Sequence, residues 1–176
     1  GLASSAEYLP NLKLISNHGV GYDVYGDVRT KFANKGVLVT HTPGVLDAET
    51  STTAILLMLA CYRQFLACDT HARTGVWEAT GPYPLTRSAD RRKVGLLGMG
   101  RIGQAIARKL VAFDCDVCYH TRRSKESELP KYTHYPNLID MAKDVDCLIC
   151  ICPGGEQTYH IVNEQVMNAL GPTGTL

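Results

Sequence analysis

The feature that most constrains this fold is a glycine-rich turn between an apolar run and an amphipathic run. Residues 94–103 read Val-Gly-Leu-Leu-Gly-Met-Gly-Arg-Ile-Gly, and the apolar residues around their start predict a strand over 93–97. A helix is predicted over 102–113 and a further strand over 117–120. A strand, a glycine turn, a helix and a second strand within about 30 residues form the βαβ arrangement of a dinucleotide-binding unit.

Each glycine of this turn has its own expected role. Gly98 permits the tight turn, Gly100 lets the backbone approach a pyrophosphate, and Gly103 allows the helix to pack closely on the strand. The amides of Arg101 and Ile102 would face the phosphates, because the helix dipole favours negative charge there. A structural glycine turn without a ligand is the weaker alternative, given the strand and helix that flank it. We therefore predict that these five residues bind a nicotinamide cofactor.

The residues after the second strand indicate which nicotinamide cofactor to expect. An NAD-binding unit carries an Asp or Glu about 20 residues after the first glycine, which binds the ribose 2′-hydroxyl. Here residues 119–124 are Tyr-His-Thr-Arg-Arg-Ser, and no carboxylate occurs between Asp116 and Glu126. A guanidinium can form paired hydrogen bonds with a 2′-phosphate. Thr121 and Arg122 therefore favour NADP(H) over NAD(H); the alternative is a solvated turn that happens to contain arginines.

The whole chain alternates strands and helices, which predicts an α/β fold with a Rossmann-like, doubly wound parallel sheet. The helix expected over 47–71 is apolar almost all round, so we expect it to be buried against more than one neighbour. A loop rich in Gly, Pro, Thr and Ser at 74–89 is the best internal linker. The remaining expected strands are 12–16, 37–40, 146–151 and one beginning at Gly174, and the remaining helices are 27–34, 138–143 and 164–170.

That long helix has a predicted apolar stripe, made of Ala54, Leu57, Met58, Cys61 and Leu66. These positions follow most of the spacing of one face of an α-helix. Ile55, Leu56 and Leu59 lie outside this stripe and make the helix apolar almost all round.

The cysteines raise and then weaken the prospect of a zinc site. Two CxxC pairs, Cys115 with Cys118 and Cys147 with Cys150, have a spacing that is typical of zinc sites. Both pairs lie in or beside predicted strands, where residues i and i+3 point to opposite faces, so we predict no metal site. The count of 7 cysteines is odd, which argues against a fully paired disulfide framework and favours a reducing, cytoplasmic compartment.

Composition excludes several classes of partner. The 176 residues carry a net charge of +1, which gives no electrostatic footprint for nucleic acid or an anionic membrane. No apolar run reaches the roughly 18 residues that a membrane span needs. The start of the chain lacks a basic stretch followed by an apolar core, so we expect no signal peptide.

Five segments, in the family's own order, resemble the D-isomer-specific 2-hydroxyacid dehydrogenases and are most similar to their glyoxylate/hydroxypyruvate reductase branch. They are NLKLISNHGVGYD (11–23), VTHTPGVLDAET (39–50), RTGVWEATGPYP (73–84), VGLLGMGRIGQAIARKL (94–110) and CPGGEQTYHIVNEQVMNALGPTGTL (152–176). The resemblance implies hydride transfer between a nicotinamide and a small 2-keto or 2-hydroxy acid. It also implies a remnant of a flavodoxin-like substrate domain at 1–46 and an NAD(P)-binding domain at 47–176. The latter begins with an interdomain helix that helps form a homodimer.

The resemblance assigns further site residues. Val20 and Gly21 match a turn whose N–H groups bind the substrate carboxylate, and successive glycines at a strand end can form such an anion-binding nest. An ordinary strand-to-loop turn is the alternative there. Arg101 and Ile102 match the pyrophosphate-binding pair, and Arg122 matches the residue that binds the 2′-phosphate. The loop that runs past the adenosine matches Cys152, Pro153 and, just beyond them, Thr158.

The sequence also departs from the family pattern. His18 stands where the family has an aliphatic or aromatic residue, and Thr52 where it has an Asp or Glu. The family's catalytic Arg, Glu and His follow the strand that begins at Gly174, so we assign no catalytic residue in this chain; His160 matches a non-catalytic position. We expect the natural protein to continue past Leu176, and we expect the 176-residue chain alone to be inactive.

Three functions stay open at this point. The first is NADPH-dependent reduction of glyoxylate or hydroxypyruvate. The second is a non-catalytic, nucleotide-sensing relative that acts like a corepressor. The third is a 2-hydroxyacid dehydrogenase of another specificity, such as lactate, 3-phosphoglycerate or formate.

Overall fold

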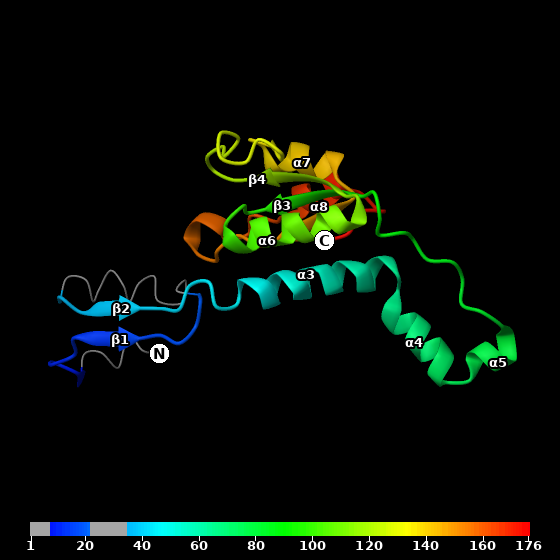
Figure 1. The fold of residues 1–176 in the computed structure, drawn as a ribbon, viewed down its shortest axis with the longest axis horizontal. Helices are drawn as coiled ribbons and strands as arrows, with labels where there is room; N and C mark the ends of the chain where they lie inside the picture. The colour runs from blue at the N-terminus through cyan, green and yellow to red at the C-terminus, as the bar shows by residue number, and fades with distance from the viewer. Residues whose placement is uncertain (1–7, 22–34) are drawn as a thin grey trace. The chain divides into compact units, whose positions relative to one another are not determined.

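The computed structural model describes residues 8–21 and 35–176, which form two compact units (Figure 1). The first unit contains Gly1–Asp47 and Pro153–Ile161, and the second contains Ala48–Cys152 and Val162–Leu176. The helix predicted over 27–34 lies outside the described residues.

The described part of the first unit contains a sheet of two short parallel strands, β1 (Leu14–Ser16) and β2 (Leu38–Thr40). Both strands lie within the ranges that the sequence predicts. Leu14 pairs with Leu38, and their side chains are 52% and 68% exposed. Two strands with exposed leucines bury little apolar surface, so this sheet has almost no core of its own.

The second unit is built on a four-stranded parallel sheet, which confirms the predicted fold class. The strands are β3 (Lys93–Leu97), β4 (Asp116–His120), β5 (Thr133–His134) and β6 (Cys147–Cys150), in the order β5-β4-β3-β6. The two-residue β5 is too short to be predicted from an apolar pattern. The strand expected from Gly174 is reduced to one bridge between Thr175 and Cys147.

Helices cover both faces of this sheet. Alternate residues of a strand point to opposite faces, so neighbouring residues of β3 contact different helices. On one face Val94 and Leu96 share a buried cluster with Ile106 of α6 (Arg101–Leu110) and Met58 of α3 (Asp47–Tyr62). On the other face a Cβ on Gly95 would lie 3.2 Å from Met141 of α7 (Leu138–Asp144). The last helix, α8 (Glu164–Leu170), packs against α7. The layers on the two sides of the sheet can be followed in Figure 1.

The single helix predicted over 47–71 is wrong, because the chain breaks it into α3 and α4 (Phe65–Arg73). Gln64 at the break has a φ of 47°, a left-handed conformation that ends a helix. No single helix in the described residues is long and apolar enough to cross a membrane; α3 and α4 reach that length and composition only together, and they bend by 63° at the break.

The predicted apolar stripe of this region is buried only in part: Met58 is buried and Ala54 packs against the core cluster, but its other members do not face the core. The face of α3 that is buried consists of Ser51, Ile55, Met58 and Tyr62. Leu57 is 61% exposed, as is Leu56, and Leu66 of α4 is 77% exposed. A helix that is apolar on all sides does not by its spacing reveal which side meets the sheet.

Two smaller boundaries differ from the prediction. The expected linker at 74–89 contains a short helix, α5 (Val76–Thr80). The helix after the glycine turn ends as α6 at Leu110, and a 3₁₀ turn, η3 (Val111–Phe113), completes it. Helix ends often tighten in this way to satisfy their last carbonyls.

The second CxxC pair lies within a strand, as the sequence predicts. Cys147 is 2% exposed while Cys150 is exposed, which places them on opposite faces of β6. Burial raises the pKa of the Cys147 thiol to about 12. In the described part of the chain no group of three or more metal-binding side chains comes together, and all seven cysteines are free.

Candidate dinucleotide-binding site

The glycine turn connects β3 to α6, and its three glycines meet three different surroundings. Gly98 has a φ of 109°, and a Cβ there would lie 2.9 Å from the backbone nitrogen of Cys152. A Cβ on Gly103 would overlap the Gly98 carbonyl oxygen. A Cβ on Gly100 would meet no atom within 4 Å. The turn therefore combines a tight bend, a close helix contact and an open backbone, the features that let a pyrophosphate approach in dinucleotide-binding units.

The N-terminus of α6 begins directly after this turn and has no side-chain cap. Gly100 is the N-cap. The first turn carries no acidic residue, so nothing there neutralises the positive end of the helix dipole. Arg101 is exposed and Ile102 is half-buried against the core cluster. First-turn amides without a capping group form an anion-binding site.

The sheet topology places this turn at the point where the strand order reverses. From β3 the chain proceeds outward to β4 and β5, and then crosses back to β6 on the other side of β3. Ligands of such sheets bind beyond the carboxyl ends of the strands, where the strand order reverses. The Gly98 N–H donates to His120 O at 3.0 Å, and Ile151 N–H donates to Leu97 O at 3.0 Å, so the ends of β4 and β6 flank the turn.

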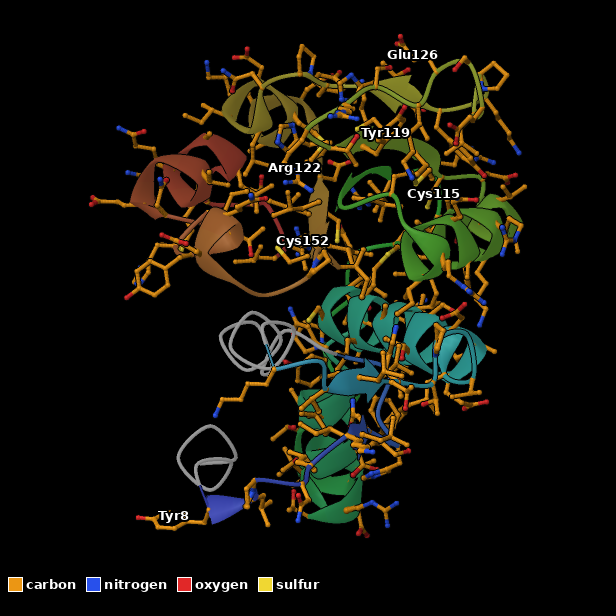
Figure 2. All side chains as sticks on the ribbon, turned by 90° about the vertical axis from the view of Figure 1, so that its left-hand side faces the viewer. Tyr8, Cys115, Tyr119, Arg122, Glu126 and Cys152 are labelled. Carbon is orange, nitrogen blue, oxygen red and sulfur yellow. The ribbon has the colours of Figure 1, made fainter. Side chains whose placement is uncertain are left out.

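The two flanking strands deliver different residues to the site. Arg122 comes just after β4 and Cys152 just after β6 (both labelled in Figure 2), so the parallel strands place them at the same end of the sheet, whereas Cys115 comes just before β4. Arg122 is exposed, and the loop around it is held by two hydrogen bonds of Thr121. The Thr121 hydroxyl donates to Arg123 O at 2.6 Å, and the Thr121 carbonyl oxygen lies 3.0 Å from His134 Nε2. These bonds fix the backbone of the loop that carries the exposed Arg122.

The segment after β6 is shaped by its own hydrogen bonds. The Thr158 hydroxyl donates to Pro153 O at 2.7 Å and lies 3.3 Å from Gly155 O. Thr158 ends a single 3₁₀ turn, η4 (Glu156–Thr158). Burial raises the pKa of the Cys152 thiol, so the side chain beside the glycine turn stays neutral. Pro153 and Thr158 thus define the course of the loop, and Cys152 brings no charge to this end of the sheet.

In the first unit, the turn predicted to bind a carboxylate has all its carbonyls engaged. Asn17 Nδ2 donates to Gly19 O at 3.2 Å and to Gly21 O at 2.9 Å, while Asn17 Oδ1 accepts from Gly19 N–H at 3.1 Å. His41 Nδ1 lies 3.0 Å from Val20 O. Within the described ranges, no acceptor is assigned to the N–H groups of Val20 and Gly21. Carbonyls held on one side leave these donors to form an anion-binding nest.

The comparisons with known proteins can now be set beside this geometry. The model of the NAD-binding domain of the D-isomer-specific 2-hydroxyacid dehydrogenases matches residues 55–176, more than half of the chain. The chain belongs to this family. Its second unit accordingly has the Rossmann-like NAD-binding fold of 2-hydroxyacid dehydrogenases.

Individual relatives of this dehydrogenase family are similar along nearly the whole chain. Glyoxylate/hydroxypyruvate reductase A of Arabidopsis thaliana is 42% identical, over 96% of this chain and 52% of its own. Hydroxyphenylpyruvate reductase of Plectranthus scutellarioides is 38% identical, over 99% of this chain and 54% of its own. The chain therefore spans about half the length of these relatives.

A solved structure is likewise similar along nearly the whole chain. It is the NADPH-dependent glyoxylate/hydroxypyruvate reductase of Sinorhizobium meliloti in complex with NADP and malonate. This chain superposes on it with a TM-score of 0.89 at 42% identity. The match covers 96% of this chain and 52% of the reductase chain.

Sequence reasoning missed four residues that act at the two turns. Asn17, His41 and Lys125 bond to turn carbonyls, and Tyr119 accepts from the Lys125 N–H. Asn17 had a signal, because an Asn before a glycine commonly bonds to the backbone two residues on. His41 and Lys125 bond to the turns across 21 and 26 positions, which no local pattern shows, whereas Tyr119 lies only 6 positions from Lys125.

The histidines singled out in the sequence take no part in these two turns through their side chains. His18 is exposed, and its carbonyl accepts a hydrogen bond from the Thr42 hydroxyl at 2.8 Å. His160 has a φ of 50° and packs its ring on Tyr159, with centroids 4.0 Å apart. Thr52, the other departure from the family pattern, donates to Ala48 O at 2.9 Å within α3.

Proposed function

We propose that this chain carries the cofactor-binding and carboxylate-binding elements of an NADP(H)-dependent reductase. Its substrate would be a small 2-keto acid, glyoxylate or hydroxypyruvate, and its product the D-2-hydroxy acid. The observation that carries the proposal is the open glycine turn beside the Arg122 loop at the carboxyl end of the sheet. When bound, the nicotinamide supplies the hydride that reduces the keto group.

The residues of the chain would divide the work of holding cofactor and substrate. The backbone at Gly100 and the amides at the start of α6 would hold the pyrophosphate. Arg122 would bind the 2′-phosphate, and the nest at Val20 and Gly21 would bind the substrate carboxylate. The exposed position of Arg122 and the assigned carbonyl partners of the nest support these roles.

Catalysis would depend on the Arg, Glu and His that the family resemblance implies. We propose that they lie in the part of the whole protein that follows residue 176. The Arg would bind substrate, the His would donate the proton to the carbonyl oxygen, and the Glu would hold the His and raise its pKa.

We also propose a homodimer in the cytoplasm. Leu56 and Leu57 of α3 and Phe65 and Leu66 of α4 are each more than half exposed. A run of exposed apolar side chains on successive helices is typical of a contact surface. The free cysteines support a reducing compartment. Light scattering of the chain checks the dimer, and a monomer at tens of micromolar would contradict it.

The cofactor part of the proposal can be tested on this chain by thermal denaturation with NADPH or NADH at equal concentration. A ligand at a hundredfold excess over its dissociation constant stabilises by about 2.7 kcal/mol. We expect the larger shift with NADPH and a reversed order in Arg122→Asp. Arg123→Asp is the matched control, because it changes the same charge at the next residue. Equal shifts in the wild type, or a larger one with NADH, would contradict the NADP(H) preference.

The reaction itself is tested on the whole protein. NADPH oxidation is followed with glyoxylate, hydroxypyruvate and hydroxyphenylpyruvate, the last because a relative is named for it. We expect turnover of at least one of the first two and none with the 176-residue chain. A whole protein that binds NADPH but reduces none of the three would favour a nucleotide-sensing role.

A further inference from the structure

The backbone of Lys125 is fixed to the core of the second unit. Its N–H donates to the hydroxyl of Tyr119 at 2.9 Å. Tyr119 lies in β4 and is fully buried, and its ring packs on His134 with centroids 5.1 Å apart (Figure 2). Lys125 is half-buried, whereas Arg122 and Arg123 of the same loop are exposed. Lys125 is therefore a cation of this loop with a fixed backbone and a half-buried side chain.

The side chain of Lys125 reaches the glycine turn. Its ammonium donates to the carbonyl of Met99 at 3.1 Å, between Gly98 and Gly100. Met99 is itself fully buried, so this carbonyl has a fixed position. A lysine ammonium has three donors, and in the described residues Met99 O is the one acceptor assigned to it. No acidic side chain of those residues forms an ion pair with it.

Lys125 thus places a positive charge with spare donors between two segments that a dinucleotide would touch. The glycine turn borders the pyrophosphate side, and the loop at Thr121 and Arg122 borders the substituent on the ribose. A compact ammonium suits a phosphate as a point charge, while Arg122 can bind it through two parallel hydrogen bonds. The Lys125 ammonium is in addition held at the turn by its hydrogen bond to the Met99 carbonyl.

We propose that Lys125 is a second determinant of the preference for NADP(H), with its ammonium binding the 2′-phosphate together with Arg122. This role rests on the proposed NADP(H) dependence of the chain. A purely structural lysine that holds the turn through Met99 would support all adenine nucleotides equally. A lysine that binds the 2′-phosphate supports only those that carry it.

The test compares two probes that differ only in the 2′-phosphate, adenosine 2′,5′-bisphosphate and adenosine 5′-monophosphate. Their dissociation constants are measured by calorimetry on the wild-type chain and on Lys125→Met, Lys125→Arg and Lys131→Met. Lys131 is the matched control, because it is an exposed lysine of the same connection and packs beside the Tyr132 ring. None of the substitutions removes the Lys125 N–H that Tyr119 accepts.

We expect Lys125→Met to weaken the bisphosphate about tenfold or more, as for loss of a hydrogen bond to a charged group, and the monophosphate less than about twofold. Lys125→Arg should recover most of the loss, and Lys131→Met should change neither constant. Equal weakening of both probes in Lys125→Met, or no weakening, would overturn the role of Lys125. A wild type that binds the two probes equally would instead overturn the NADP(H) preference on which that role rests.

Discussion

The described residues include two backbone turns that we propose as anion sites, and they are held in different ways. The turn at residues 98–103 is shaped by close packing, because a Cβ on Gly98 or Gly103 would strike backbone atoms. The turn at residues 19–21 is shaped by side chains, chiefly Asn17 and His41. A turn shaped by packing does not tolerate a larger side chain, whereas a turn shaped by side-chain hydrogen bonds depends on a few polar groups. The two turns should therefore fail under different substitutions.

The largest effect is expected for Gly103→Ala. Alanine is better than glycine within a helix by about 1 kcal/mol, but the new methyl group would overlap the Gly98 carbonyl. Overpacking against backbone costs about 1–3 kcal/mol or more, so we expect a net loss of stability and of NADPH binding. Urea denaturation of the chain measures the first and a thermal shift the second.

Gly100→Ala is the matched control for that change. Its Cβ meets no protein atom, so the free energy of unfolding should fall by less than about 1 kcal/mol, the value of a poorer N-cap. NADPH binding should still weaken, because the methyl group enters the open space at the turn. Similar stability losses in the two variants would contradict the division between packing and open backbone.

A smaller and local effect is expected for Asn17→Ala. The substitution removes the donor to Gly19 O and Gly21 O and the acceptor for Gly19 N–H. A typical hydrogen bond contributes about 0.5–1.5 kcal/mol, and the loss should appear as faster hydrogen exchange at Val20 and Gly21. Exchange in β3 and α6 should not change, and Asn11→Ala, at an exposed position, should leave both turns as they are. Faster exchange across both units would show that the turns are not held independently.

The smallest effect is expected at the amino end of β3, far along the strand from the glycine turn. Lys93 Nζ lies 2.6 Å from Asp144 Oδ2, and this hydrogen bond, followed by one from Tyr135, lowers the pKa of the Asp144 carboxyl. Because the folded state favours the ionised carboxylate, this pair contributes to the free energy of unfolding. The contribution is complete above the ordinary aspartate pKa of about 3.9, and it is lost as the pH falls below that value. The pair is partly exposed, so Asp144→Asn should cost no more than about 1 kcal/mol.

That difference should vanish in acid. Wild type and Asp144→Asn should converge in urea midpoint as the pH falls toward 3, while both bind NADPH equally at pH 7. A variant that binds NADPH more weakly at pH 7 would contradict the independence of the turn from this end of the strand.

Much of the second unit could be predicted from short-range pattern. The strand Lys93–Leu97 and the helix Glu164–Leu170 have the boundaries that apolar spacing predicts. The structural surroundings of Gly98 and Gly103 also follow from the sequence, because a glycine turn between a strand and a helix has few packed solutions. The break at Gln64 could not be predicted, since the residues on both sides continue the apolar pattern.

The choice of the buried face of α3 was likewise beyond the sequence. Leu57 and Ile55 have similar hydrophobicity, yet one is exposed and the other buried, because only one face meets β3 and α6. The hydrogen bonds that hold the candidate site also could not be predicted from the sequence, because they join distant positions. Lys125 reaches Met99 across 26 positions and His41 reaches Val20 across 21, and both contacts exist only after the strands have paired.

The sequence by itself determined the βαβ unit, its glycine turn and the absence of a carboxylate after β4, because these depend on residues within one supersecondary element. The tertiary structure decided the strand order that reverses at the turn, the side of α3 that is buried and the position of the Lys125 ammonium at the turn. Those properties depend on contacts between distant segments, and the free energy of such contacts is set by packing in three dimensions rather than by local preference.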